Sequence, residues 1–213
     1  MTTIETKGQV FEVDDEIADV YNHFSRKTDT VYIPELATDL IVKLFAITYI
    51  KDIADYYTSD RIARSNWTQH TATTFFKTCQ QLNFLCDFEV EKRHDGAIRD
   101  DKGNVYLCAE WEFDTNSIFN IKGEIEKLYE TTKKHKSCDA MLFTYKAASG
   151  FNEFAEKVLT KWNSLLKENE DHRLFLLTAL LKKDEIEKVS YFQGIRILVF
   201  GNNTLDIWDD FMA

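Results

Sequence analysis

The chain has 213 residues, of which 44% are hydrophobic, enough for a substantial core. Its formal net charge of −10 opposes non-specific attraction to nucleic acid, which counts against a protein that simply coats DNA. The sequence shows no signal peptide, and no apolar stretch approaches the ~18 to 20 residues of a membrane span. No linker rich in Pro, Gly or Ser divides the chain. We therefore expect a single domain, residues 1–213, in a cytoplasmic protein that does not bind membranes.

The first third of the chain is predicted to be helical. Apolar residues recur at helical spacing from Glu35 to about Tyr57, and Pro34 suits the first turn of that helix. An amphipathic helix is expected before it, near residues 14–24. A third helix is expected from Asn66 or Thr68 to about Gln81.

The pattern then changes to strands. Residues 84–92 alternate between apolar and polar side chains, which predicts a half-buried strand. A short second strand is expected at 95–99 and a third at 105–113. The sequence DDKGN at 100–104 is typical of a turn, so 94–113 is predicted to form a hairpin.

The remaining chain alternates between helices and strands. The expected elements are a helix at 117–136, a strand at 141–145, a helix at 152–167, and strands at 173–181 and 189–200. Between residues 66 and about 146, the order is therefore helix, three strands, helix, strand.

Two glutamates, Glu110 and Glu112, lie two positions apart in the apolar strand 105–113, so they are expected to share one face. Like charges side by side are costly unless solvent, a cation or a raised pKa compensates. Pairing across the hairpin is expected to bring Asp95 close to both glutamates. Three converging carboxylates suit Mg²⁺ or Mn²⁺. The alternative is the solvent-facing edge of an amphipathic strand, although Glu is disfavoured in strands.

The order of elements and two motifs resemble the PD-(D/E)XK nuclease superfamily. HDGAI at 94–98 is similar to the second-strand aspartate motif of that family, and AEWEF at 109–113 is similar to its third-strand motif. The likeness is to the type II restriction endonucleases whose last motif residue is Glu instead of Lys. It covers roughly residues 66–146. It implies an α/β protein with a restriction-endonuclease-like α/β/α core. The flanks lie outside the likeness, and their patterns predict a helical N-terminal region and an αβ C-terminal extension.

The resemblance also implies roles for individual residues. Asp95 and Glu110 would hold the metal, and Glu112, in the position usually held by Lys, would act as general base or further ligand. His94 stands where the family usually has proline. It is expected to be an exposed turn histidine, and the alternative is that it contacts substrate or tunes the site. Lys122 is expected to bind a substrate phosphate. For this lysine and those that follow it, the alternative is a solvated helix face.

These features predict a Mg²⁺- or Mn²⁺-dependent endonuclease that hydrolyses phosphodiester bonds, in DNA rather than RNA. The alternative is a non-catalytic protein of nuclease fold that binds nucleic acid or a protein partner, which the acidic composition also favours. A double-strand cutter needs two active sites or two sequential nicks, so a symmetric homodimer is a linked expectation. Trp111 and Phe113 are expected in the core.

Overall fold

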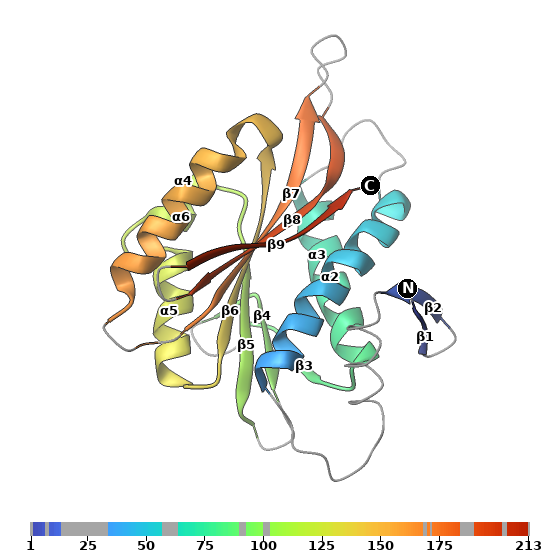
Figure 1. Ribbon diagram of the computed structural model, residues 1–213, viewed down its shortest axis with the longest axis horizontal. Helices are drawn as coiled ribbons and strands as arrows, with labels where there is room; N and C mark the ends of the chain where they lie inside the picture. Colours follow the sequence, from blue (N-terminus) through green and yellow to red (C-terminus); the bar gives the residue numbers. More distant parts are fainter. Residues whose placement is uncertain are drawn as a thin grey trace.

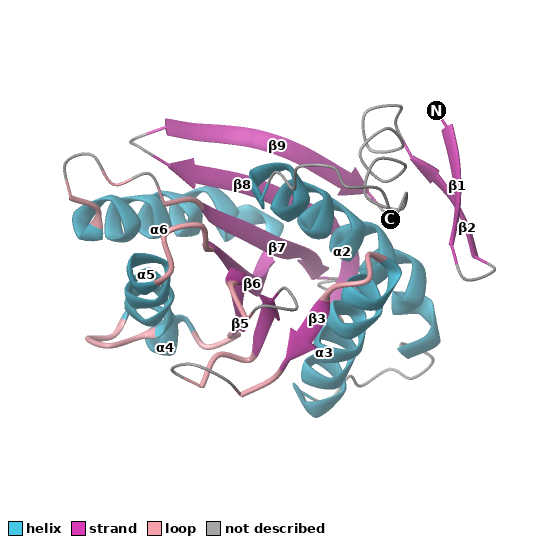
Figure 2. Ribbon diagram, turned by 90° about the horizontal axis from the view of Figure 1, so that it is seen from below, coloured by secondary structure: helices cyan, strands magenta, loops and turns pink. Residues whose placement is uncertain are grey.

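The computed structural model describes residues 2–6, 9–13, 34–56, 64–89, 93–99, 103–167, 170, 172–183, 190–201 and 204–212. These residues form a mixed α/β protein with a two-stranded sheet and a larger, seven-stranded sheet (Figure 1). Helices cover both faces of the larger sheet (Figure 2). Within the described residues, none of the helices combines the length and the hydropathy that crossing a membrane requires.

The N-terminal region contains strands as well as helices. Strands β1 (Thr2–Thr6) and β2 (Gln9–Val13) form an antiparallel pair. The purely helical first third predicted from the sequence was therefore wrong in this respect. Helices α2 (Pro34–Tyr56) and α3 (Arg64–Gln81) confirm two of the predicted helices. The third, predicted near 14–24, lies outside the described residues.

The seven-stranded sheet has its strands in chain order, from β3 at one edge to β9 at the other. The strands are β3 (Leu85–Asp87), β4 (Gly96–Arg99), β5 (Val105–Trp111), β6 (Asp139–Ala147), β7 (Leu174–Lys183), β8 (Ser190–Gly201) and β9 (Thr204–Met212). The first three are antiparallel, β5, β6 and β7 are parallel to one another, and β8 and β9 are antiparallel again. Parallel neighbours need crossover connections, which helices supply here. Every predicted strand has a counterpart, but β3 covers only part of the strand predicted at 84–92, and β5 ends before the predicted residue 113. Strand β9 is an addition to them.

The crossover from β5 to β6 holds two helices, so the single helix predicted at 117–136 was wrong. The helices on this side of the sheet are α4 (Thr115–Phe119), α5 (Glu124–Lys134) and, after β6, α6 (Phe151–Leu165). Lys122 has a left-handed backbone with φ of 61°, and a Cβ at Gly123 would lie 2.5 Å from the Ser117 carbonyl oxygen. The chain therefore turns here, and the apolar side chain of Ile121 is 89% exposed.

Two hydrophobic cores lie on opposite faces of the large sheet. One fills the space between the sheet and helices α4, α5 and α6, and the other fills the space between the sheet and helices α2 and α3. Side chains of β5 alternate between them: Cys108 belongs to the first core and Ala109 to the second. This alternation directs the next residue, Glu110, towards α5, and Trp111 into the second core as predicted.

Candidate functional site

Glu110 lies at the end of β5, beneath helix α5, and is only 2% exposed. Gly96 pairs with Ala109 across the β4–β5 ladder, which places Asp95 beside Glu110 at the same end of the two strands. The structure thus brings together the two residues that were expected to hold a metal. They belong to neighbouring strands and were connected in the sequence only by the predicted hairpin turn.

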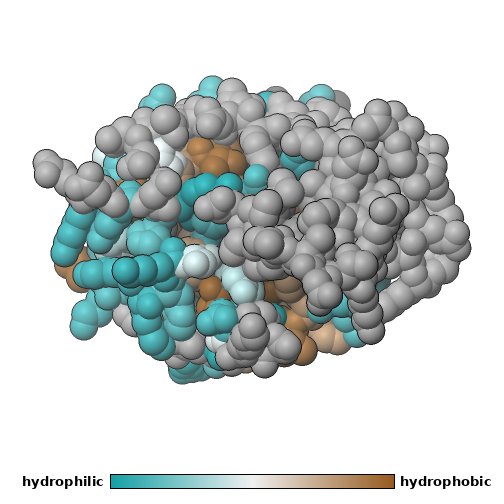
Figure 3. Space-filling model, turned by 60° about the horizontal axis from the view of Figure 1, so that its bottom comes forward, coloured by the Kyte–Doolittle hydropathy of each residue, from teal (hydrophilic) through white to brown (hydrophobic). Residues whose placement is uncertain are grey.

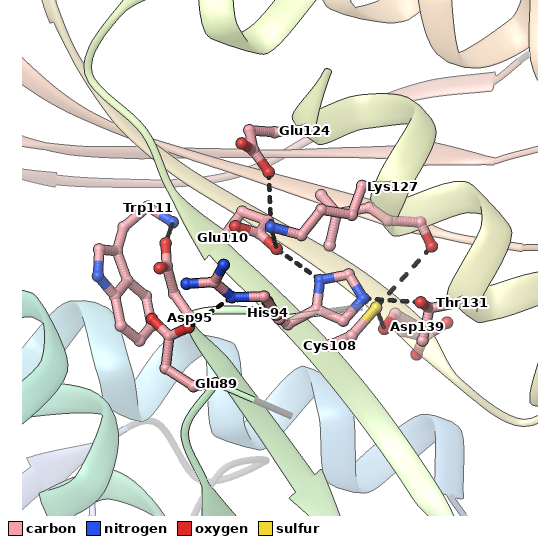
Figure 4. Close-up of polar contacts among 12 residues, drawn as sticks. Glu89, His94, Asp95, Cys108, Glu110, Trp111, Glu124, Lys127, Thr131 and Asp139 are labelled. Atoms are coloured by element: carbon pink, nitrogen blue, oxygen red, sulfur yellow. Dashed lines mark hydrogen bonds and ion pairs between the residues drawn. The ribbon is translucent and has the colours of Figure 1, made fainter. Parts of the chain in front are cut away.

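A continuous chain of polar contacts surrounds the Glu110 carboxyl group (Figure 4). Its Oε1 atom lies 2.5 Å from His94 Nδ1 and 2.7 Å from Lys127 Nζ. On the far side of His94, the Nε2 atom lies 2.7 Å from Thr131 Oγ1. Lys127 Nζ also lies 3.0 Å from Glu124 Oε2. We refer to Glu124, Lys127, Glu110, His94 and Thr131 as the Glu110 network.

Helix α5 supplies three members of the Glu110 network because of their spacing. Glu124, Lys127 and Thr131 lie three and seven positions apart, which places them on one face of the helix. The apolar residues Ile125 and Leu128 pack this side of the helix into the core, so the three polar residues are carried to the end of β5. The helix position therefore determines which cation reaches Glu110.

Burial dominates the electrostatics of Glu110. The pKa of this carboxyl is raised from 4.5 to about 10, chiefly by burial and also by the charges of Glu124 and Asp95, while the contact with Lys127 opposes the rise. Burial lowers the pKa of Lys127, but its contacts with Glu110 and Glu124 more than offset this and leave it raised. One lysine thus does not compensate the negative charge of this site. An additional cation would favour the ionised form of Glu110.

Asp95 is partly buried and has a defined orientation. Its Oδ2 atom accepts a hydrogen bond of 2.9 Å from the backbone N–H of Trp111, the residue after Glu110 (Figure 4). Burial raises the pKa of Asp95, while this N–H and the charge of Lys127 oppose the rise. The backbone of β5 therefore holds the Asp95 carboxylate next to the strand end that carries Glu110.

Glu112 does not continue the strand as the sequence predicted. Strand β5 ends at Trp111, and the Glu112 backbone N–H donates to the Phe143 carbonyl 3.1 Å away. The side chain turns to the following loop, where Oε1 accepts hydrogen bonds from the N–H groups of Phe113 (2.6 Å) and Asp114 (2.8 Å). The expected side-by-side pair of glutamates is thus replaced by one buried carboxyl and one bound to the backbone.

The other two predicted site residues differ in their exposure. His94 is fully buried, so the expectation of an exposed turn histidine was wrong, and its two ring nitrogens contact Glu110 and Thr131. Lys122 is exposed in the turn before α5, where its backbone N–H donates to Glu126 Oε2 at 2.8 Å. His94 is therefore placed to support Glu110, and Lys122 is placed at the surface.

The lysines near the end of α5 lie on a solvated surface, as the alternative interpretation held. Lys133, Lys134 and Lys136 are all exposed. Hydrophilic side chains gather over this helical layer on the left of Figure 3. Lys127 is different because it points inward to Glu110, and sequence reasoning did not single it out. Its spacing from Glu124 and Thr131 was the available signal.

Comparison with known proteins adds no family assignment. No model of a known protein family matches the chain, and no curated protein matches it in sequence. A functional assignment therefore depends on the geometry of Asp95 and the Glu110 network, together with the motif resemblance described above.

Proposed function

We propose that this chain is a metal-dependent nuclease of the PD-(D/E)XK type, with a restriction-endonuclease-like core, that hydrolyses phosphodiester bonds in DNA. The observation that carries the proposal is the meeting of Asp95, Glu110 and Lys127 at one end of β5. Two carboxylates and a lysine are the residue types that the resembled motif uses. The lysine comes from helix α5, whereas the motif position itself holds Glu112.

Asp95 and Glu110 are the residues that would hold Mg²⁺ or Mn²⁺. Within the part of the chain that the structure describes, no group of three or more His, Cys, Asp or Glu side chains is arranged to hold a metal ion. Mg²⁺ does not require such a group, because it commonly takes one or two protein carboxylates and completes its shell with water and substrate phosphate oxygens. Glu110 lies near the carboxyl groups of Asp95 and Glu124, and this excess of acidic groups over Lys127 fits such a cation. When bound, the metal ion would activate water and stabilise charge on the phosphate.

The resembled motif usually has a lysine at the position of Glu112. Lys127 supplies the positive charge that this lysine would provide. Its ammonium group lies 2.7 Å from Glu110, and its side chain is 20% exposed. A cation at this point can orient an attacking water and stabilise the negative charge that develops on the phosphate. Glu112, which is bound to two backbone N–H groups, is left with the smaller role.

His94 and Thr131 act as positioning residues for Glu110. The imidazole fills the space between Glu110 Oε1 and Thr131 Oγ1 with contacts of 2.5 and 2.7 Å, and none of its surface is exposed. A carboxylate that binds metal is commonly hydrogen-bonded by residues behind it, which fix its orientation. His94 thereby supports the reaction without contacting the substrate.

A second candidate is a non-catalytic protein that retains this fold and binds nucleic acid or a protein partner. It is favoured by the saturation of the site: Glu110 Oε1 contacts both His94 and Lys127, and Glu112 Oε1 is held by the backbone. A buried polar network of this kind also stabilises a fold without any catalysis. Cleavage assays separate the two candidates.

The decisive experiment incubates supercoiled, linear and single-stranded DNA, and RNA, with purified protein and Mg²⁺ or Mn²⁺. We expect wild type to cut DNA and chelator or Glu110→Ala to abolish cutting. The matched control is Glu156→Gln, which changes an exposed carboxylate on α6 and should cut like wild type. Far-UV circular dichroism must show that Glu110→Ala remains folded. Absence of cleavage by wild type on every substrate, with retention of DNA by both proteins, would favour the second candidate.

Cutting both strands in one binding event would require two copies of the site, whereas a single copy would need two sequential nicks. Each chain offers one Asp95–Glu110 pair, so we propose that the active form on duplex DNA is a symmetric homodimer. Analytical ultracentrifugation with and without duplex DNA should detect it. A strict monomer that only nicks one strand would contradict this part of the proposal.

A further inference from the structure

Unlike the partly buried Lys77, Lys127 and Lys161, Lys146 forms no ion pair with a carboxylate among the described residues. Its ammonium group donates to the Thr115 hydroxyl and lies 4.4 Å from the centre of the Phe154 ring. By contrast, Lys127 pairs with Glu110 at 2.7 Å, and Lys161 pairs with Glu126. In a chain with a net charge of −10, a partly buried cation held by a hydroxyl and a ring instead of a carboxylate needs an explanation.

Partial burial disfavours the charged form of Lys146, and its present contacts only partly offset this effect. Burial lowers the pKa of its ammonium group, and the charge of Asp114 only partly offsets this. A hydroxyl and an aromatic ring face stabilise a cation less than an anion does. An anionic ligand at this point would gain a charge-assisted hydrogen bond with little rearrangement, because Thr115 and Phe154 already hold the side chain in place.

The position of Lys146 relates it to the proposed active site. Glu110 pairs with Leu142 on the parallel strand β6, and Lys146 lies four residues further along that strand, about 13 Å at the usual rise per residue. An even spacing places it on the same face as Leu142, the face covered by α4, α5 and α6. Its partner Thr115 begins α4, directly after the loop that holds Glu112. The ammonium group therefore lies beside the loop that leaves the site.

We propose that Lys146, held by Thr115, binds a backbone phosphate of the nucleic acid. This phosphate would lie beside the site, near the C-terminal end of β6. This inference rests on the proposed function because it takes the bound molecule to be the nuclease substrate. The contact is to phosphate, so it adds affinity for any sequence and positions the strand relative to Asp95 and Glu110. Lys146 is thus a substrate-positioning residue outside the catalytic carboxylates.

The test measures binding of a 30-base-pair duplex by fluorescence anisotropy, with Ca²⁺ or EDTA to prevent cleavage, between 50 and 200 mM NaCl. Loss of one phosphate contact should reduce the slope of log K against log salt by about 0.9. We expect Lys146→Gln to show that reduction and to bind several-fold more weakly at 100 mM NaCl. Lys146→Arg should retain most of the affinity. The matched control Lys157→Gln, at an exposed lysine on α6, should leave slope and affinity unchanged.

The outcomes separate this inference from the proposed function. A wild-type affinity and slope for Lys146→Gln, or an equal loss for Lys157→Gln, would overturn the phosphate contact. So would a wild type that binds neither duplex nor single strands. A lysine-dependent salt slope in a protein that never cleaves would support the contact and reject the nuclease. Competition by inorganic phosphate at low millimolar concentration, without selective loss of DNA binding in Lys146→Gln, would assign the site to a free anion and overturn the backbone contact.

Discussion

The substitution Glu110→Gln preserves the size of a buried side chain and removes its titration, so it isolates the electrostatic cost of burying Glu110. Burial raises the pKa of this carboxyl from 4.5 to about 10. Between these two pH values the folded protein binds a proton that the unfolded chain does not bind. The stability of wild type must therefore fall as pH rises through this window, and the fall continues up to the folded pKa.

The size of the effect follows from the same two pKa values. Each pH unit within the window changes stability by up to about 1.36 kcal/mol, so the change from pH 5 to pH 7 is about 2.5 kcal/mol at most. Glutamine does not titrate and lacks this dependence. We therefore expect the stability of Glu110→Gln relative to wild type to improve by up to about 2.5 kcal/mol between pH 5 and pH 7.

Urea unfolding at pH 5, 6 and 7, at constant ionic strength and with EDTA to remove metal, measures this difference. The control is Glu156→Gln at an exposed position, which should track wild type across the range. A difference between Glu110→Gln and wild type that stays constant within about 0.5 kcal/mol would refute the reasoning. It would mean that Lys127 and His94 fully compensate an ionised Glu110 in the folded protein.

Three further predictions test other parts of the structure. Lys127→Gln should lower the DNA cleavage rate in a single-turnover assay on the order of 10²-fold. Glu112→Gln should change the rate less than about tenfold, because the Glu112 carboxylate is bound to the backbone. A larger loss for Glu112→Gln than for Lys127→Gln would assign the general base to Glu112. In chemical denaturation, Gly123→Ala should destabilise the protein by roughly 2 to 3 kcal/mol, because its Cβ would lie 2.5–2.9 Å from three carbonyl oxygens. The control Gly150→Ala should cost less than about 1 kcal/mol, because no atom lies within 4 Å of its Cβ. Arg173→Met should lower stability by about 3 kcal/mol because it leaves the buried Asp139 and the partly buried Asp39 without their ion-pair partner at 2.6 and 2.8 Å. A loss under about 1 kcal/mol would show that these ion pairs are solvated.

Local signals in the sequence were sufficient for most of the elements that build the site. The alternation of apolar and polar residues predicts β3, and the turn residues at 100–104 predict the hairpin that brings Asp95 to Glu110. Both signals act over short chain separations, where strand period and turn chemistry decide the pairing. The crossover helix was predicted in the right place, but its break before α5 was not. The break depends on how closely the Gly123 backbone approaches the end of α4.

The identity of the partners of Glu110 was decided only by tertiary structure. Lys127 is one of several lysines between 122 and 136, and it alone lies 2.7 Å from Glu110 because packing of Ile125 and Leu128 sets the rotation of α5 over the sheet. The same packing buries His94, which short-range reasoning placed at an exposed turn. By itself the sequence determined which strands carry the carboxylates, since that follows from periodicity and turns. Which cation meets them depends on the docking of a helix, and no local pattern encodes that contact.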